Sequence, residues 1–349
     1  MNNNKPNDEF LRMLPKPELH LHLIGAIRRS TLEDLMRKYS VNFPAKPGGF
    51  IQKLKLDKYK NLDEAFRFEK FEDFLRLYIL CMHVIREPED MERLTGEVLE
   101  DLRNCGVVYV EISINLPPDR HFNMDSLDIL NAINKAGKRV GEKLGIEYRI
   151  IIDLVRDYGP EKSMEILNSM AEMGDQNIVA VDIGGSEHRF PPGPYREVYK
   201  RARELGFRTR AHAGEAAGPE SVWGAIRELK VDRIGHGVRS IEDPELIRYL
   251  VRKQIPLEVC PTSNIRTGVY SSIEEHPLRK LFDAGVKITL NSDDPGLFGS
   301  NVLGEYRLLM DRFGFSKDEI VKVVKNGFES AFIPHDRKEY YLSRLELVM

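Results

Sequence analysis

The chain has 349 residues, of which 42% are hydrophobic, so it can bury a large core as one big barrel or as two ordinary domains. Its 52 lysines and arginines nearly balance its 55 aspartates and glutamates, which leaves a formal net charge of -3. This balance argues against nucleic acid or an anionic membrane as the main partner and favours a small diffusible substrate.

Short runs of β-branched or apolar residues recur along the chain, each followed by a longer stretch with helical periodicity. The expected strands are residues 19–23, 107–114, 148–154, 178–183, 208–213, 232–236, 256–260 and 287–291. The expected helices between them are residues 91–104, 127–143, 160–173, 195–205, 220–229, 244–253 and 277–284. Residues 317–349 are expected to add closing helices.

Glycines follow several of these helices, at Gly106, Gly145, Gly206 and Gly285, where a residue with positive φ can end a helix. Strands that alternate with helices of this length imply parallel pairing through right-handed crossovers. Eight such units predict an α/β protein with a (β/α)8 TIM barrel, in a single domain over residues 1–349.

The segment between the first two expected strands, residues 28–104, is far longer than one crossover requires. It contains an aromatic helical patch of Phe66, Phe68, Phe71 and Phe74. Two interpretations stay open: core packing of an amphipathic helix, or a lid that covers the barrel mouth and sandwiches a flat apolar ligand.

Histidines and carboxylates gather where the chemistry of such a barrel lies, at the C-terminal ends of the strands. They are His20 and His22, two residues apart on the first expected strand, His212 on the fifth, His236 on the sixth, and Asp293 with Asp294 after the eighth. Side chains two apart on a strand point to the same side. Three imidazoles and a carboxylate, with one position open for water, form the ligand set expected of a catalytic zinc ion.

Glu215 lies three residues after His212, in a His-Ala-Gly-Glu stretch where a strand turns into a loop. Gly214 lets the backbone fold tightly there, so the carboxylate can reach back over the metal. A glutamate beside a zinc-bound water is a candidate general acid or base, and a solvated loop glutamate is the alternative. Gly185, after the fourth strand, suggests close backbone approach to a ligand, with a plain turn as the alternative.

Five motifs together resemble those of the adenosine deaminase family. They are Pro-Lys-Pro-Glu-Leu-His-Leu-His-Leu at 15–23, His-Ala-Gly-Glu at 212–215, Gly-His-Gly at 235–237, Cys-Pro-Thr-Ser-Asn at 260–264 and Asn-Ser-Asp-Asp-Pro at 291–295. They stand in the family's order and span nearly the whole chain.

The resemblance implies that His20, His22, His212 and Asp293 bind one zinc ion. Some related barrel hydrolases hold two metals through a carboxylated lysine or a glutamate at the end of the fourth strand. Here that strand ends in Asp-Ile-Gly, with neither residue, so we expect a single metal.

The resemblance also implies how an adenine ring would be held and attacked. Glu215 would hand a proton to ring N1, and His236 would orient and stabilise the attacking hydroxide. Asp294 would hydrogen-bond N7, and the backbone of Gly185 would meet N3. Attack at C6 would give a tetrahedral intermediate that loses ammonia, so the expected partners are a purine nucleoside and water.

One position departs from the family pattern. The family usually has an acidic residue before the glycine of the first motif, where it contacts the sugar 5'-hydroxyl, whereas this chain has Ile24 before Gly25. An apolar wall at Ile24 would favour a bulkier or less polar 5' substituent. The substrate is therefore expected to be adenosine or a 5'-modified analogue, such as the aminodeoxyfutalosine of menaquinone synthesis or 5'-methylthioadenosine.

Two other classes of function stay open: a different metal hydrolase on the same scaffold, for an ester or a cyclic amide, and a binding protein that has lost turnover. The three cysteines, Cys81, Cys105 and Cys260, form no CxxC pair and are typical of thiols in a reducing compartment. The polar first ten residues lack the apolar core of a signal peptide, so we expect a cytoplasmic protein.

Overall fold

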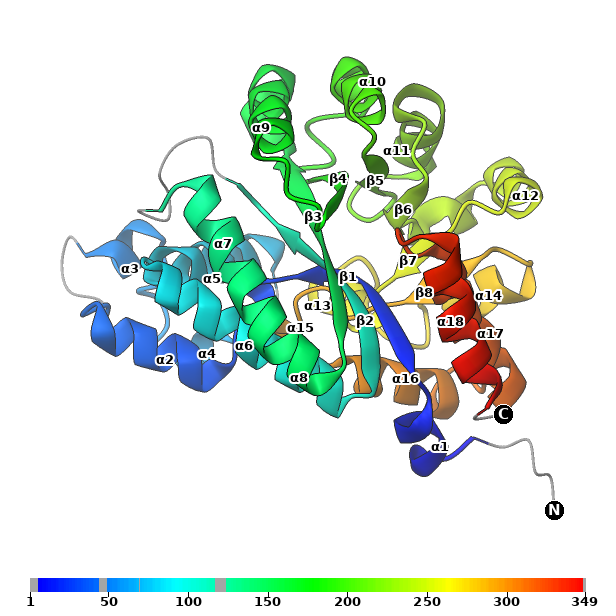
Figure 1. The fold of residues 1–349 in the computed structure, drawn as a ribbon, viewed down its shortest axis with the longest axis horizontal. Helices are drawn as coiled ribbons and strands as arrows, with labels where there is room; N and C mark the ends of the chain where they lie inside the picture. Colours follow the sequence, from blue (N-terminus) through cyan, green and yellow to red (C-terminus); the bar gives the residue numbers. More distant parts are fainter. Residues whose placement is uncertain (1–5, 44–48, 69, 117–123, 348–349) are drawn as a thin grey trace.

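Eight parallel strands at the centre of the molecule follow one another in chain order (Figure 1). The computed structural model describes residues 6–43, 49–68, 70–116 and 124–347. The strands are β1 (Lys16–His22), β2 (Val107–Ile114), β3 (Glu147–Val155), β4 (Ile178–Gly184), β5 (Arg208–Ala213), β6 (Arg233–His236), β7 (Leu257–Val259) and β8 (Ile288–Leu290). Each pairs in parallel with the next, which confirms the predicted (β/α)8 barrel.

The barrel closes where β1 meets the residues after β8. The amide of Asp293 donates to the carbonyl of His20 at 2.9 Å, and the amide of His22 donates to the carbonyl of Asp293 at 2.9 Å. Asp293 has a φ of 65°, and a left-handed conformation costs a non-glycine residue about 1–2 kcal/mol. The closing hydrogen bonds hold this strained backbone at the mouth of the barrel.

Helices cover the outside of the barrel (Figure 1). Those that connect successive strands are α6 (Pro88–Asn104), α7 (Ser126–Ala136), α9 (Gly159–Met173), α10 (Arg196–Glu204), α11 (Pro219–Gly224), α12 (Pro244–Lys253) and α14 (Leu278–Asp283). The closing helices are α17 (Lys317–Ser330) and α18 (His335–Glu346). Within the described ranges, no helix combines the length and the apolar character that crossing a membrane requires.

Some helices differ from the expectation. The helix expected over 127–143 consists of α7, the π-helix η2 (Gly137–Gly141) and α8 (Glu142–Leu144), and the one expected over 220–229 is α11 followed by the π-helix η5 (Ala225–Leu229). Four helices were not expected: α1 (Asp8–Met13), α13 (Pro261–Arg266), α15 (Pro295–Phe298) and α16 (Val302–Asp311). Except for α16, they are too short for apolar periodicity to reveal them. The four glycines expected to end helices all have positive φ.

Four helices lie between β1 and α6, within the long segment 28–104: α2 (Arg29–Lys38), α3 (Phe50–Lys53), α4 (Leu62–Ala65) and α5 (Phe71–Val84). Residues 44–48 and 69 of this segment lie outside the described residues. Both interpretations of the aromatic patch apply in part. Phe68 is buried against Phe74 and Phe298, whereas Phe71 and Phe74 line the cavity described below.

Charged side chains fill part of the barrel interior. Arg210 and Arg233 are fully buried and share the carboxylate of Glu258, at 3.2 Å from the Arg210 guanidinium and 2.6 Å from the Arg233 guanidinium. Arg210 also donates to Asp182 at 2.6 Å, and Arg233 is paired with Glu111. Each of these two buried arginines therefore has carboxylate partners that compensate the cost of burying its charge.

Candidate active site

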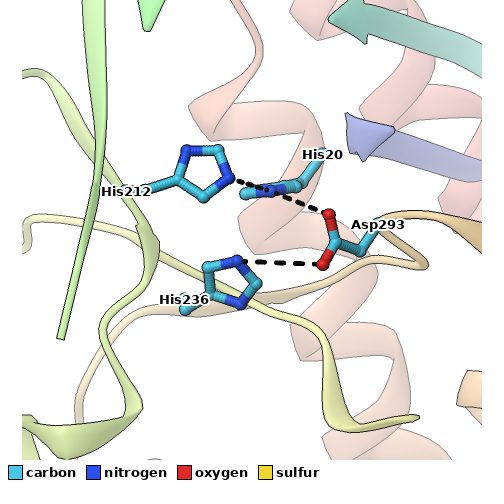
Figure 2. A group of neighbouring side chains, drawn as sticks. All are labelled: His20, His212, His236 and Asp293. Atoms are coloured by element: carbon cyan, nitrogen blue, oxygen red, sulfur yellow. Dashed lines mark hydrogen bonds and ion pairs between the residues drawn. The ribbon is translucent and has the colours of Figure 1, made fainter. Parts of the chain in front are cut away.

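The predicted site residues meet at one end of the barrel, because parallel strands bring their carboxyl ends to the same face. His20 and His22 come from β1, His212 from β5 and His236 from β6, while Asp293 follows β8. All five side chains are buried. Figure 2 shows four of them, with the imidazoles of His20, His212 and His236 grouped around the carboxylate of Asp293.

Four atoms have the spacing of ligands around one cation. Nε2 of His212 lies 3.1 Å from Nε2 of His20 and 3.3 Å from Nε2 of His22. Oδ1 of Asp293 lies 3.4 Å from Nε2 of both His20 and His22. Ligands about 2.0–2.1 Å from a tetrahedral ion are separated by about 3.4 Å, so these four atoms could hold a metal.

A carboxylate lies behind each of these three imidazoles. Nδ1 of His20 lies 2.8 Å from Oε2 of Glu258, and Nδ1 of His212 lies 2.8 Å from Oδ2 of Asp182. Nδ1 of His22 lies 3.6 Å from Oδ2 of Asp153. A close carboxylate at Nδ1, as at His20 and His212, keeps the proton on that nitrogen and leaves the Nε2 lone pair free, which is the usual arrangement behind a metal-binding histidine. The separation at His22 is too long for a hydrogen bond.

His236 belongs to an overlapping group of candidate ligands with His20, His212 and Asp293 (Figure 2). Its Nε2 is farther away, at 3.9 Å from Oδ2 of Asp293, and lies 3.5 Å from Oε2 of Glu215. The φ of His236 is 60°, so its backbone, like that of Asp293, is strained. Desolvation holds the pKa of His236 well below its usual value, so the ring is neutral.

Glu215 reaches the same cavity from the loop after β5. Burial, with the charge of Asp293 as the next cause, raises the pKa of Glu215 to about 8. The carboxylate of Glu187 holds this loop: it accepts hydrogen bonds from the backbone amides of Gly214, Glu215, Ala216 and Ala217, at 2.6 to 3.2 Å. Sequence analysis did not identify Glu187, because nothing in its local pattern indicates partners 27 or more residues away.

Asp294 points its carboxyl group into the cavity beside Asp293. Its Oδ1 is buried and has no hydrogen-bond partner among the residues that the structure describes. A Cβ atom at Gly25 would lie 1.7 Å from this oxygen, so only glycine at position 25 leaves room for it. Desolvation, reinforced by Asp293, raises the pKa of Asp294 well above its usual value.

The cavity has a volume of about 330 Å³. Glu215, Asp294 and Gly185 line it together with His22, His212 and His236, and Phe71 and Phe74 of α5 line it from the side of the long segment. Gly185 has a φ of 95°, and a Cβ there would lie 2.5 Å from Oδ2 of Asp157.

Ile24 is the one predicted site residue that does not join this group. It lies in the 3-10 turn η1 (Ile24–Ala26), is fully buried, and is not among the residues that line the cavity. The turn directs this apolar side chain into the core.

The family model described as "Adenosine deaminase" matches residues 15–348 of this chain. The chain is 33% identical over 336 residues to an adenosine deaminase of Clostridium acetobutylicum, covering 95% of this chain and 97% of that protein. It is 32% identical to an adenine deaminase of Crocosphaera subtropica, over 95% of this chain and 98% of the relative. It is also 32% identical to an aminodeoxyfutalosine deaminase of Streptomyces avermitilis, over 93% of this chain and 88% of the relative.

The chain also resembles solved structures of deaminases and of an amidohydrolase. An adenine deaminase from Arthrobacter aurescens aligns with a TM-score of 0.86 at 28% identity, covering 96% of this chain and 98% of that one. An amidohydrolase from Burkholderia ambifaria with bound zinc aligns with a TM-score of 0.84 at 26% identity, over 99% and 95% of the two chains. The N6-mAMP deaminase of Arabidopsis aligns with a TM-score of 0.83 at 26% identity, covering 97% of this chain and 99% of that one.

Proposed function

Because this chain belongs to the adenosine deaminase family, we propose that it removes the 6-amino group of an adenine nucleoside by hydrolysis, with zinc as its metal. The broader statement is that the chain is a metal-dependent amidohydrolase whose relatives deaminate adenine-based compounds. The observation that carries the proposal is that ligand atoms of His20, His22, His212 and Asp293 lie 3.1 to 3.4 Å apart in four contacts, beside a cavity that Glu215 lines.

The proposed zinc ligands are His20, His22, His212 and Asp293. Their three nitrogen atoms and one oxygen suit zinc, and the close carboxylates at Nδ1 of His20 and His212 leave the Nε2 lone pairs of these two rings available. When bound, zinc would lower the pKa of a water molecule towards about 7 and so supply a nucleophile at neutral pH. His236 then orients that nucleophile towards C6 of the ring.

Three groups that line the cavity, on Glu215, Asp294 and Gly185, match the chemistry of adenine. The ring nitrogens N1, N3 and N7 of adenine are hydrogen-bond acceptors and therefore need donors. Glu215 and Asp294 act as donors in their acid forms, which burial favours in both, and they meet N1 and N7. The amide of Gly185 donates to N3. Transfer of the Glu215 proton to N1 makes C6 more electrophilic, and the water oxygen forms a bond to C6. One proton of the water passes to the amino group, which leaves as ammonia when its bond to C6 breaks, and the other restores the acid form of Glu215.

The outer part of the cavity favours a nucleoside over a nucleotide. Leu75, Ile79 and Met82 on α5 and Tyr158 beyond β3 give it apolar walls. Among its described lining residues none is lysine or arginine, so they offer no cation for a 5'-phosphate. These walls support a 5'-modified adenine nucleoside as an alternative to adenosine, and the similarity to an aminodeoxyfutalosine deaminase supports the same alternative.

A substrate panel tests the proposal. We expect the zinc-loaded protein to lower the absorbance of the adenine band with adenosine, 5'-methylthioadenosine or aminodeoxyfutalosine, and to turn over AMP and free adenine poorly. A preference for a 5'-modified substrate would identify the alternative. Turnover of ester or cyclic amide substrates, without any deamination, would instead favour a different metal hydrolase and contradict the proposal. The variant Glu215→Gln serves as the inactive control.

A further inference from the structure

A chain of hydrogen bonds leads from the backbone of α14 to His236. The amide of Leu278 lies 3.2 Å from Nδ1 of His276, as its hydrogen-bond donor. A backbone amide can only donate, so Nδ1 of this ring is the acceptor. Burial lowers the pKa of His276 to about 3, so the ring is neutral and carries its single proton on Nε2.

The protonated Nε2 of His276 faces the side-chain oxygen of Asn264 at 3.1 Å, and donates to it. This bond fixes the orientation of the Asn264 amide, so its NH2 group points the other way. The NH2 nitrogen lies 3.2 Å from Nδ1 of His236. The rings of Tyr270 and Phe313 pack against the His276 ring in T-shaped contacts, at centroid distances of 5.2 and 5.9 Å.

We propose that Asn264 and His276 are positioning residues that hold His236 in the tautomer protonated at Nε2, so that this ring presents an N–H to the cavity. The Asn264 amide can only donate to Nδ1 of His236, which must therefore be the unprotonated nitrogen. All three partners are buried, and water does not compete for these bonds.

The group that contacts Nδ1 distinguishes His236 from His20 and His212. His20 and His212 have a carboxylate at Nδ1, which places the proton there and frees Nε2 for a metal. His236 has an amide donor at Nδ1, so its Nε2 carries the proton and cannot bind a metal. The group at Nδ1 thus excludes His236 from the ligand set.

The consequence for catalysis rests on the proposed function. An N–H at Nε2 donates a hydrogen bond to the oxygen of the attacking water or hydroxide, and favours the form that carries negative charge. It cannot at the same time accept a proton from that water. His236 is therefore a hydrogen-bond donor to the nucleophile and not its general base.

The tautomer can be read directly in the zinc-loaded protein, from the 15N chemical shifts of histidine-labelled samples with the variant His236→Gln for assignment. We expect wild-type His236 to be protonated at Nε2 alone. Asn264→Asp replaces the donor by an acceptor of the same shape, so His236 should gain a proton at Nδ1. Protonation of wild-type His236 at Nδ1, or an unchanged tautomer in Asn264→Asp, would overturn the proposal.

Activity gives a second test. We expect Asn264→Asp to lower kcat by about 100-fold or more, with KM within about threefold and zinc content unchanged, since a wrong tautomer removes an interaction of the transition state. His276→Gln keeps an N–H donor and should retain more activity than His276→Leu. Tyr270→Phe touches the same ring outside the hydrogen-bond chain and is the matched control.

The outcomes are distinguishable. A kcat within twofold of wild type in Asn264→Asp, equal activity of the two His276 variants, or a kcat loss that follows zinc loss would each overturn the proposal. If neither Asn264→Asp nor the His276 variants fold, these residues serve stability alone, which also overturns it. If the wild-type protein deaminates no nucleoside, the proposed function is wrong, and the 15N shifts still decide the tautomer.

Discussion

Glu258 lies directly behind His20: its Oε2 is 2.8 Å from Nδ1 of that ring, on the opposite side from Asp293. The same carboxylate accepts from Arg210 and lies beside Arg233. The proposed metal site is therefore anchored to the charged interior of the barrel and not only to the strand that carries the histidine.

Metal affinity should depend on this contact. Glu258→Gln removes the charge that keeps the proton on Nδ1 of His20, and we expect zinc affinity to fall about 10–100-fold, as measured by competition with a chelator. Glu111→Gln is the control, because Glu111 is also paired with Arg233 but lies behind no histidine. Equal zinc affinity of the two variants would show that Glu258 does not orient His20.

The free energy of unfolding should depend strongly on Arg210. Arg210→Met leaves the buried carboxylates of Asp182 and Glu258 without this partner, which should cost about 3–5 kcal/mol in urea unfolding of the metal-free protein. Arg208 lies two residues earlier in β5, is paired with Asp232, and is largely exposed. Arg208→Met should cost less than about 1 kcal/mol, and a similar loss in both variants would contradict the argument.

The pH dependence of kcat/KM should report Glu215. Its pKa is raised to about 8, and the acid form is the one that donates to N1. The contribution of this proton should therefore be fully present below the pKa of Glu215 and be lost as the pH rises through about 8. Glu215→Gln should lower kcat by about 100-fold or more and remove this alkaline fall. An alkaline fall that persists in the variant would assign it to another group.

The loop that carries Glu215 should depend on Glu187. Glu187→Gln replaces one of two acceptor oxygens by a donor, so the four backbone amides of 214–217 lose part of their support. We expect faster amide hydrogen exchange in this loop and a kcat about 10–100-fold lower, because small displacements of a catalytic group are costly. Glu220→Gln is the matched control, since the exposed Glu220 accepts from the amide of Gly218 and, among the described residues, from no amide of 214–217. Unchanged exchange in Glu187→Gln would rule out this support.

The sequence predicts the strands and the convergence of the site residues well, because both depend on local periodicity and on the rule that strand ends share one face. His20 and His22 could be paired from strand alternation alone. His276 received no role, since its partner Asn264 lies twelve positions earlier and only the tertiary fold brings them together. Ile24 was expected to form a cavity wall, whereas its turn buries it, and turn geometry is not visible in residue types.

Because Asp293 closes the barrel near the end of the chain, it is synthesised after the histidines of the site. A nascent chain that has left the ribosome as far as β7 already contains His20, His22, His212 and His236, but not the carboxylate whose backbone joins the last strand to the first. The complete ligand set thus forms only after most of the polypeptide has been translated. The proposed metal ligands are consequently brought together only when the two ends of the barrel join.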